Sequence, residues 1–428
     1  MNYQETLDFL FSIEKFGIKL GLERIREYLN VLENPHHQYP SIHIAGTNGK
    51  GSTAAMIQSI LTAAGYKIGL LTSPHLVDFS ERMRIGYRNC ETNYIVNFIK
   101  KNRELMNEIP VSFFEITTAM AFQYFADKEV DAAIVEVGMG GRLDATNVLT
   151  PMISIITNID YEHTKSLGNT LEAIATEKGG IIKPGVPCIT ASKDYVVKKT
   201  LRKICGNQKS NLISIYDENQ WLEKSLSFKG TSIEVFTRGR KYNNLFINLS
   251  GRHQLENAIT ALTAVEMMHE NGFNVNQRAV MAGFRDIHLK GRQQILSEKP
   301  LVIADVAHNS AGIKTLKETL LEMAPGRRII AVFGILSDKD HTQMLNDISK
   351  FVETVILTKP VTERAADPEI LAQTAKKLNQ NCQVIPLVRE AYKHAIDIAG
   401  ENDIVVITGS HYTVGEILSA LGRHQRYK

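Results

Sequence analysis

Short runs of apolar, mostly β-branched residues alternate with helical patterns along the chain from about Ser41 onward. The first of these runs are SIHIA, KIGLL, DAAIVEV, ISIITNI and PCITA. Each run is apolar throughout instead of alternating with polar residues, which is typical of strands buried on both faces. Because helical segments separate the runs, the pattern predicts a parallel sheet covered by helices on both sides.

The pattern changes twice further along the chain. Between Leu212 and Leu249 the runs LISIY, SIEVF and LFINL are joined by turn-like segments, which predicts a small antiparallel patch followed by the helix NAITALTAVEMMHE. Beyond HLKGR a new set of strands begins, each followed by a helical segment: LVIAD, RIIAVFG, TVILT, QVIP and DIVVITG. We therefore predict an α/β protein of two domains with a boundary near Lys290, namely residues 1–289 and a smaller doubly wound, Rossmann-like domain of residues 290–428.

Length and composition agree with this picture. Single hydrophobic cores stop growing at roughly 250 to 300 residues, and the chain has 428. Apolar residues make up 43% and charged residues 22%, as in soluble globular enzymes. The net charge of +3 predicts no broad electropositive face for a nucleic-acid backbone.

Cysteine spacing and the N-terminus bear on the compartment. The four cysteines form no CxxC pair, which argues against a zinc site or a disulfide framework and favours a reducing environment. The N-terminal apolar pattern contains acidic residues, unlike a signal peptide, and no run approaches the ~18 apolar residues that a bilayer span requires. We expect a cytoplasmic protein without a membrane partner.

The run SIHIAGTNGKGSTAAMIQSILTAAG joins a buried strand, a glycine-rich turn and an amphipathic helix in the order of a phosphate loop. Its glycines let the backbone approach phosphate oxygens, and the helix N-terminus and Lys50 supply positive charge. A strict P-loop has Ser or Thr directly after the Lys, but here Gly51 intervenes. A glycine-rich turn can also be a tight connection alone, yet strand, Lys and helix together favour ATP. The predicted contacts are Thr47, Asn48, Gly49, Lys50, Gly51 and Ser52.

Three strands end in polar side chains. Ser73 follows KIGLL, Glu136 closes DAAIVEV, and His163 follows ISIITNI. Open α/β sheets bind ligands at the carboxyl ends of their strands, so these side chains should converge near the phosphate loop. The alternative is a capping or salt-bridged Glu136 and a structural His163.

Eight motifs in order resemble the folylpolyglutamate synthase and dihydrofolate synthase family of Mur ligases. They are GTNGKGS, TSPHLVDFSER, FFEITTAMAF, IVEVGMGGRLDATN, LGNTLEAIATEKGGIIKPG, GRHQLENA, DVAHN and GILSDKD, with TGSHYTVGEIL near the end. The resemblance implies a P-loop-containing Mur-ligase-type domain with a folate site in residues 1–289 and a smaller Rossmann-like ligase domain in residues 290–428. It also implies an ATP-dependent, ADP-forming carboxylate–amine ligase.

The resemblance assigns metal and catalytic residues. Ser73, Glu136 and His163 would hold Mg²⁺ at the nucleotide phosphates, although this chain has Glu162 where relatives usually carry Asp. Lys178 matches a lysine that is carbamylated in the family and would hold a second Mg²⁺. A surface Lys at a helix end is the alternative, and Gly179 stands where Ala is common. The predicted catalytic residues are Lys50, Lys178 and His308.

Further contacts follow from the same resemblance. Asn257, Arg292 and Asp305 would bind ATP together with His308, unless Asp305 and His308 are a helix cap and a packed loop residue. Val306 occupies a position that is usually Gly, and Val disfavours positive φ. The predicted substrate contacts are His75 for dihydropteroate, Asp144 for the pterin ring or else a turn cap, and Ser410 with His411 and Tyr412 near glutamate.

The implied reaction transfers the γ-phosphoryl group of ATP to a pteroate or folate carboxylate, after which the amine of L-glutamate attacks the acyl phosphate. One rival is another Mur-type amino-acid ligase, which would need a separate N-terminal domain where only about 40 residues precede the phosphate loop. The other is a nucleotide-binding regulatory module, which leaves Glu136, His163 and Lys178 unexplained. The expected partners are small molecules and the expected state is a monomer. The sequence leaves open whether dihydrofolate, polyglutamate tails or both are made.

Overall fold

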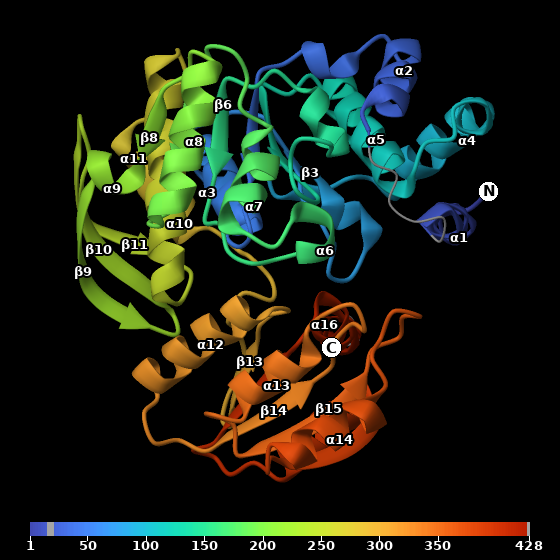
Figure 1. Ribbon diagram of the computed structural model, residues 1–428, viewed down its shortest axis with the longest axis vertical. Coiled ribbons are helices and arrows are strands. Elements are labelled where there is room, and N and C mark those ends of the chain that lie inside the picture. The colour runs from blue at the N-terminus through green and yellow to red at the C-terminus, as the bar shows by residue number, and fades with distance from the viewer. Residues whose placement is uncertain (15–20, 426–428) are drawn as a thin grey trace. The chain divides into compact units, whose positions relative to one another are not determined.

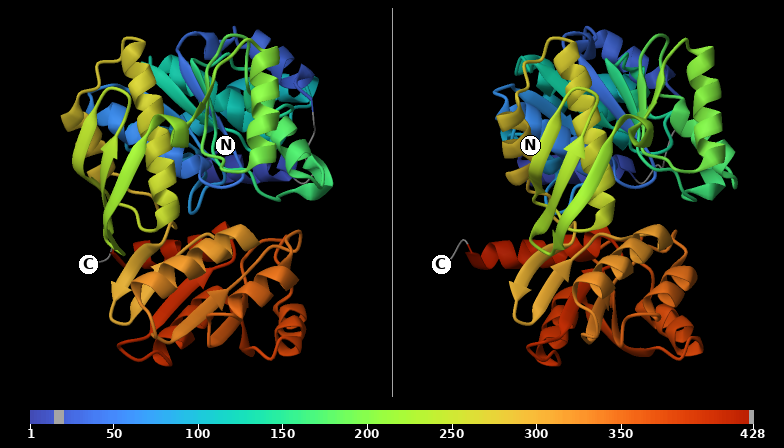
Figure 2. Two further views of the ribbon diagram at one scale, coloured as in Figure 1. Left: turned by 60° about the vertical axis from the view of Figure 1, so that its left-hand side comes forward. Right: turned by 90° about the vertical axis from the view of Figure 1, so that its left-hand side faces the viewer.

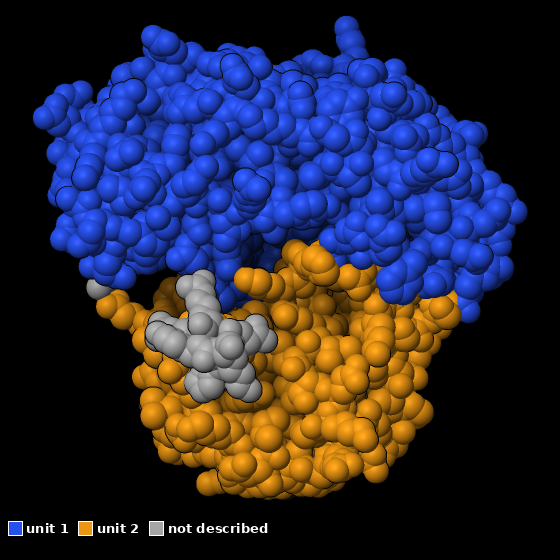
Figure 3. Space-filling model, turned by 180° about the vertical axis from the view of Figure 1, so that it is seen from behind, with its two compact units in different colours: residues 1–224, 232–247, 254–287 blue, residues 225–231, 248–253, 288–428 orange. Residues whose placement is uncertain are grey.

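The computed structural model describes residues 1–14 and 21–425 (Figure 1). The chain divides into two compact units, which Figure 3 colours separately. Unit 1 comprises Met1–Lys224, Ser232–Ile247 and Gln254–Ile287, and unit 2 comprises Ser225–Thr231, Asn248–His253 and His288–Lys428. Two short segments before residue 288 thus belong to unit 2, and the division into domains 1–289 and 290–428 stays a prediction.

Unit 1 contains an eight-stranded sheet in the order β4-β3-β2-β5-β1-β6-β7-β8. Its strands are β1 Ser41–Ala45, β2 Ile68–Leu71, β3 Met83–Ile85, β4 Arg88–Asn89, β5 Ala132–Glu136, β6 Ile153–Ile156, β7 Cys188–Thr190 and β8 Leu212–Ser214. Six strands run parallel, in the spatial order β2-β5-β1-β6-β7-β8. The β3–β4 hairpin adds antiparallel strands at the β2 edge. The four strands β1, β2, β5 and β6 are buried throughout, which confirms the predicted parallel sheet.

Helices cover this sheet. They are α1 Tyr3–Glu14, α2 Glu23–Val31, η1 Pro35–His37, α3 Lys50–Ala63, η2 Phe79–Arg82, α4 Thr92–Glu108, α5 Phe113–Asp127, η3 Ala145–Val148, α6 Thr164–Leu167, α7 Leu171–Gly179, α8 Tyr195–Asn207, α9 Ile215–Glu218, α10 Arg252–Glu270 and α11 Gln277–Arg285. One apolar cluster joins α1, α4 and α5 to Leu71 and Val135 on one face of the sheet. On the other face α3 packs against α11, where the Ser59 hydroxyl donates to the Gly283 carbonyl at 2.7 Å.

A separate three-stranded sheet has the order β11-β10-β9, with strands β9 Gln220–Ser227, β10 Gly230–Phe236 and β11 Lys241–Ile247. The connections from β9 to β10 and from β10 to β11 are short, and strands joined by such short connections are antiparallel neighbours, as predicted. The prediction was wrong for LISIY, which forms β8 and pairs parallel with β7 because helix α8 provides the crossover. The third strand is instead β9. Helix α10 lies beside this sheet (Figure 2). Its Glu266 accepts hydrogen bonds from Thr237 and Tyr242.

Unit 2 contains a six-stranded sheet in the order β12-β13-β17-β14-β15-β16. Its elements are β12 Gln294–Glu298, β13 Leu301–Ala304, α12 Ser310–Met323, β14 Ile329–Phe333, α13 His341–Ile348, β15 Thr354–Lys359, α14 Pro368–Lys377, β16 Asn381–Leu387, α15 Val388–Asp397, β17 Ile404–Thr408 and α16 His411–Gln425. All its strands are parallel except the edge strand β12. The Rossmann-like doubly wound arrangement is therefore confirmed. No helix in the described parts of the chain is long and apolar enough to span a membrane.

Candidate active site

The phosphate loop ends at Gly49, which precedes α3 with φ of 86°. A Cβ at Gly49 would lie 2.3 Å from Oδ1 of Asn257, and a Cβ at Gly46 would lie 1.8 Å from the hydroxyl oxygen of Thr157. Glycine is therefore required at both positions by space as well as by conformation. The structure brings Asn257 of α10 against the loop, and its contact with ATP stays a prediction.

Residues after β6 hold the loop in shape. The N–H groups of Thr47 and Asn48 both donate to Asn158, at 2.8 Å to its carbonyl and 2.8 Å to its side chain. The Thr157 hydroxyl donates to the Asn48 carbonyl at 2.7 Å. The first backbone bond of α3 runs from Thr53 to Gly49, so the N–H groups of the residues between them precede the intrahelical bonds. A helix N-terminus with such N–H groups is suited to bind phosphate, and the predicted phosphate contacts stay a prediction.

Two lysines meet at this loop. The Lys50 amine donates to the carbonyls of Gly46 and Thr47 at 3.0 and 3.1 Å, and the Lys178 amine donates to the Gly46 carbonyl at 2.7 Å. Lys178 is only 2% exposed, so the alternative of a surface lysine is wrong. Burial, and then the Lys50 charge, lower the pKa of Lys178 to about 7. Lys178 therefore has a substantial neutral fraction at neutral pH.

Glu136 is the last residue of β5, and its side chain lies close to the start of α3. Its side chain is 5% exposed, and Oε2 accepts the N–H of Ser73 at 3.2 Å. These two residues meet because β2 and β5 are parallel neighbours with Leu71 opposite Val135. A Cβ at Gly51 would lie 3.4 Å from the same oxygen, so a carboxylate lies close to the position where a strict P-loop has its hydroxyl residue.

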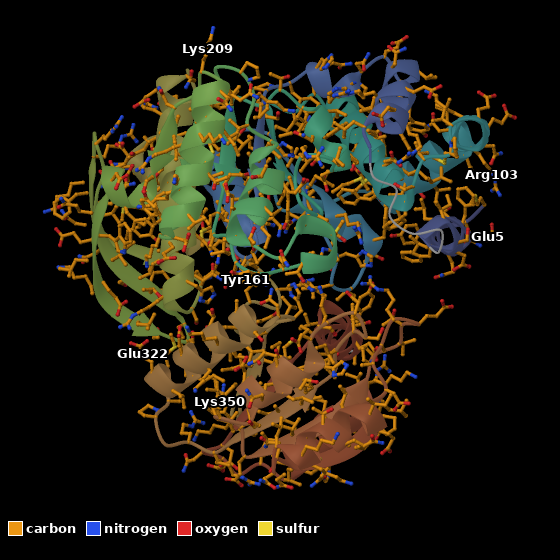
Figure 4. The ribbon with its side chains drawn as sticks, viewed as in Figure 1. Glu5, Arg103, Tyr161, Lys209, Glu322 and Lys350 are labelled. Atoms are coloured by element: carbon orange, nitrogen blue, oxygen red, sulfur yellow. The ribbon has the colours of Figure 1, made fainter. Side chains whose placement is uncertain are left out.

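His163 begins the short helix α6 in the left-handed conformation, with φ of 49°. Its Nε2 lies 3.8 Å from an oxygen of Glu162, whose charge also acts on Lys178. Tyr161, two residues before His163, is exposed (Figure 4). His163 thus follows β6 at the same carboxyl edge as Ser73 and Glu136, since β1 lies between β5 and β6 and all three are parallel.

The predicted metal ligands suit a site in which the protein and the nucleotide phosphates bind Mg²⁺ together. Within residues 1–14 and 21–425, no group of three or more His, Cys, Asp or Glu could hold a metal ion by itself. Mg²⁺ is usually bound by one or two carboxylates together with substrate phosphates and water. A buried carboxylate at the start of the phosphate-binding helix, beside Ser73, fits that role.

Asp144 shapes the loop that follows β5. One carboxylate oxygen accepts the N–H and the hydroxyl of Thr146 at 3.0 and 2.5 Å, and the other accepts the N–H of Met139 at 2.9 Å. Burial raises the pKa of this carboxyl group. The structure thus shows the turn-capping role that the sequence left open, and the pterin contact stays a prediction.

His75 belongs to an aromatic cluster. Its Nδ1 accepts a hydrogen bond from Arg82 at 2.8 Å, and its ring centroid lies 6.3 Å from Phe11 and 6.1 Å from Phe79. The Arg82 guanidinium lies 5.1 Å from the centre of the Phe113 ring. Burial and Arg82 lower the pKa of His75 to about 3, so the imidazole is neutral and carries its proton on Nε2. Sequence reasoning missed this cluster, although all its residues except Phe11 lie in the motifs TSPHLVDFSER and FFEITTAMAF.

In unit 2, both oxygens of Asp305 accept backbone N–H groups, from Gln293 at 3.0 Å and Ala307 at 2.9 Å. Asn309, not Asp305, caps α12. The Arg292 charge acts on Asp305, which brings the predicted Arg292 and Asp305 together. Val306 is not among the residues with positive φ, so this turn accommodates Val.

The other predicted residues of unit 2 are His308 and Ser410. The His308 ring lies 5.2 Å from the His411 ring, so these two residues are neighbours. The Ser410 hydroxyl accepts the N–H of Thr413 at 3.1 Å at the start of α16 and is buried. Its predicted contact with glutamate stays a prediction.

Comparison with known proteins agrees with these features. The chain matches the Mur ligase middle domain over residues 44–265 and the Mur ligase glutamate ligase domain over residues 291–411. It is 33% identical over 427 residues to the dihydrofolate synthase/folylpolyglutamate synthase of Bacillus subtilis, covering 98% of this chain and 99% of that relative.

Solved structures give the same result. Folylpolyglutamate synthase from Thermotoga maritima has a TM-score of 0.86 at 36% identity, covering 98% of this chain and 96% of that one. The Mycobacterium tuberculosis enzyme, complexed with ADP and AMPPCP, has a TM-score of 0.90 at 31% identity and 99% coverage of both chains. The Yersinia pestis enzyme, complexed with AMPPNP and a Mn ion, has a TM-score of 0.88 at 29% identity, covering 99% of this chain and 98% of that one. The chain belongs to the dihydrofolate synthase/folylpolyglutamate synthase family of ATP-dependent Mur ligases.

Proposed function

We propose that the chain forms an amide between a pteroate or folate carboxylate and the amine of L-glutamate, with ATP as the source of phosphate. The observation that carries the proposal is the convergence at the start of α3, where the amines of Lys50 and Lys178 share the Gly46 carbonyl and the Glu136 carboxylate lies beside Gly51. Family membership supplies the substrate class.

The first step makes an acyl phosphate. A carboxylate oxygen of the substrate attacks the γ-phosphorus of ATP, the bond to the β-phosphate oxygen breaks, and ADP leaves. Such transfers depend on positioning and charge neutralisation more than on proton transfer. The Lys50 ammonium and the N–H groups at the start of α3 supply positive charge, and Asn257 contacts the nucleotide beside Gly49.

The second step forms the amide. The deprotonated amine of glutamate attacks the acyl carbon, and phosphate leaves from the tetrahedral intermediate. His75, Asp144 and Ser410 are proposed to contact the folate and glutamate substrates. The neutral His75 presents an N–H donor among aromatic rings, a setting that suits a pterin.

Ser73, Glu136 and His163 are the proposed ligands of Mg²⁺, which would neutralise phosphate charge when bound. The complex of the Yersinia pestis relative with AMPPNP and a Mn ion supports divalent metal use. Within this chain, the Ser73 N–H donates to the Glu136 carboxylate at 3.2 Å, which orients a buried anionic group beside Gly51.

Lys178 is the proposed site of a carbamate. Its neutral amine would attack the carbon of CO₂ and form an N–C bond, while a proton leaves to solvent, and the resulting anion would serve a second Mg²⁺. Burial beside the Lys50 ammonium keeps part of the Lys178 amine neutral, which this reaction requires. Intact-protein mass at neutral pH with ¹³CO₂, compared with a Lys178→Met variant, tests this assignment.

Arg292 and Asp305 of unit 2 are proposed to bind the nucleotide. His308 is proposed to take part in the phosphoryl transfer. Support comes from the match of residues 291–411 to the Mur ligase glutamate ligase domain. Asp305 is held by two backbone N–H groups, and the charge of Arg292 acts on its carboxylate.

Product analysis tests the proposed function. The full chain is incubated with Mg²⁺, ATP and glutamate plus either 7,8-dihydropteroate or tetrahydrofolate, and ADP and the products are measured by mass spectrometry. A mass gain of one glutamate with dihydropteroate identifies a dihydrofolate synthase, and the same gain with tetrahydrofolate identifies a folylpolyglutamate synthase. ADP release that needs neither substrate would contradict the ligase and favour a nucleotide-dependent switch.

A further inference from the structure

Arg84 lies on the same side of the main sheet as the phosphate-binding helix. Its neighbour Met83 pairs with Leu71, and both belong to the apolar cluster under α1, α4 and α5. Arg84 pairs with Leu70 in the same register, and facing residues of an antiparallel pair point to the same side. Because side chains alternate along a strand, Arg84 and Leu70 point to the opposite face, where α3 packs.

Glu136 lies on that face too. Leu70 is opposite Ile134 in β5, and Glu136 follows Ile134 by two residues. Strand spacing places the backbones of Arg84 and Glu136 about 10 Å apart across the sheet and about 7 Å along it. The Arg84 side chain is long enough to bridge part of this separation, and the charge of Glu136 acts on it.

The Arg84 side chain is half-buried, and one of its donors lacks an acceptor. Its Nε is fully buried and has no hydrogen-bond partner among the residues that the structure describes. Burial lowers the pKa of the Arg84 guanidinium, and the nearby charges of Glu81 and Glu136 oppose that effect. A buried arginine is normally paired, because an uncompensated guanidinium is costly.

The two neighbouring carboxylates are held by other groups. Glu81 accepts the N–H groups of Leu76 and Val77 at 2.9 and 3.2 Å, and Glu136 accepts the N–H of Ser73. The Arg84 Nε–H, which has no acceptor among the described residues, keeps donor capacity for a ligand on this face of the sheet. A guanidinium presents a planar pair of N–H groups that matches the two oxygens of a carboxylate.

We propose that Arg84 binds the substrate carboxylate that receives the phosphoryl group and holds it beside Glu136. This inference rests on the proposed function and names a specificity residue for it. As one carboxylate oxygen forms its bond to phosphorus and ADP departs, Arg84 stays hydrogen-bonded to the other oxygen and no proton moves. The carboxylate is thereby oriented for attack and its charge is partly neutralised before phosphate arrives.

Binding measurements with the full chain test the proposal. Calorimetry in the presence of Mg²⁺ and AMPPNP compares 7,8-dihydropteroate with its carboxamide, in which NH₂ replaces one carboxylate oxygen, for wild type, Arg84→Met and Arg84→Lys. The matched control is Arg88→Met, an exposed arginine in the same hairpin. Tetrahydrofolate and the corresponding γ-carboxamide serve as the second pair.

Arg84→Met is expected to weaken binding of the carboxylate about ten- to a hundred-fold, the range for a charge-assisted hydrogen-bonded pair. Arg84→Lys keeps the charge without the fork and should fall between wild type and Arg84→Met. Carboxamide binding should be the same in all variants, and AMPPNP binding should not change. Arg84→Met should melt at or above the wild-type temperature, since it removes a buried N–H donor that has no acceptor.

Three results would overturn the proposal. Equal loss of acid and carboxamide binding would mean that Arg84 shapes the pocket. Weaker AMPPNP binding with unchanged substrate binding would place Arg84 on the phosphates or behind Glu136. A lower melting temperature in both Arg84 variants with intact substrate binding would make the residue structural. If the wild type binds neither dihydropteroate nor tetrahydrofolate, the proposed function itself fails.

Discussion

Lys178 shows how one buried amine links stability to chemistry. Its pKa is lowered to about 7 in the folded chain, first by desolvation and then by Lys50, whereas an unfolded lysine titrates near 10.5. Between these values the unfolded chain binds more protons than the folded chain, so this residue makes the free energy of unfolding rise with pH. The folded protein bears the cost of the buried amine at low pH.

Replacing Lys178 by Met should remove this pH dependence. Between pH 7 and 9 the wild type is expected to gain on the order of 2 kcal/mol in free energy of unfolding relative to Lys178→Met, because only the wild type has the titrating amine. Urea unfolding of both proteins in CO₂-free buffer measures the difference. Parallel pH profiles for the two proteins would show that Lys178 keeps its charge on folding.

Gly49→Ala tests whether the phosphate loop depends on space or only on backbone conformation. The new Cβ would lie 2.3 Å from Asn257 Oδ1, whereas Gly65 has a similar φ of 96° and nothing within 4 Å of its Cβ position. Both substitutions should lower the free energy of unfolding by about 1–2 kcal/mol through the left-handed backbone.

Only Gly49→Ala should also weaken binding of AMPPNP with Mg²⁺, by about tenfold or more, because displacing Asn257 changes the loop. Calorimetric titration of the two variants and the wild type checks this expectation. Comparable nucleotide affinity in the Gly49→Ala and Gly65→Ala proteins would remove Asn257 from the site.

At the scale of elements, the contact between α3 and α11 fixes the helix that begins at the phosphate loop. A Cβ at Gly283 would lie 2.4 Å from the Ile60 Cα, which belongs to backbone and cannot rotate away. Gly283→Ala is therefore expected to cost about 1–3 kcal/mol by overpacking. Gly206→Ala in α8 has open space and should be neutral or stabilising, as alanine is in helices. Thermal unfolding that ranks the two variants the other way would contradict the close packing.

The elements that the sequence predicts well are those whose side chains all face apolar surroundings. The buried runs of β1, β5 and β6 were visible because both faces of the sheet are covered. The β3–β4 hairpin could not be predicted from the sequence, since strands of three and two residues are too short to show an alternation of apolar and polar residues. LISIY was assigned to the wrong sheet because its pairing with β7 depends on a crossover through α8, which no local pattern specifies.

Across the whole molecule, some residues of the candidate site could be predicted as neighbours from the strand pattern, and others could not. Glu136 and Ser73 could be predicted as neighbours because the ends of adjacent parallel strands must meet. The burial of Lys178 could not, since it depends on α7 packing against the phosphate loop. The position of Arg84 on the same face as Glu136 could not be predicted either, since it depends on the register of three strands at once.

The single tryptophan lets the nucleotide site be followed in the intact chain. Trp221 is the only Trp in the sequence and belongs to unit 1, together with Lys50, Glu136 and Asn257. A ligand that binds only the folded state at a hundred times its dissociation constant stabilises it by about 2.7 kcal/mol. Urea unfolding followed by Trp221 fluorescence should show that increment for the wild type with ADP and Mg²⁺.

Glu136→Gln should lose part of this increment, because the neutral amide keeps the shape of Glu136 but offers a cation less charge. A tenfold weaker affinity lowers the stabilisation by about 1.4 kcal/mol at the same ligand concentration. With EDTA and ADP the two proteins should give the same small shift, since the metal contribution is then absent from both. If Glu136→Gln and wild type show equal shifts with ADP and Mg²⁺, the carboxylate beside Gly51 does not hold the ion, and the metal must be assigned to other residues at the strand ends.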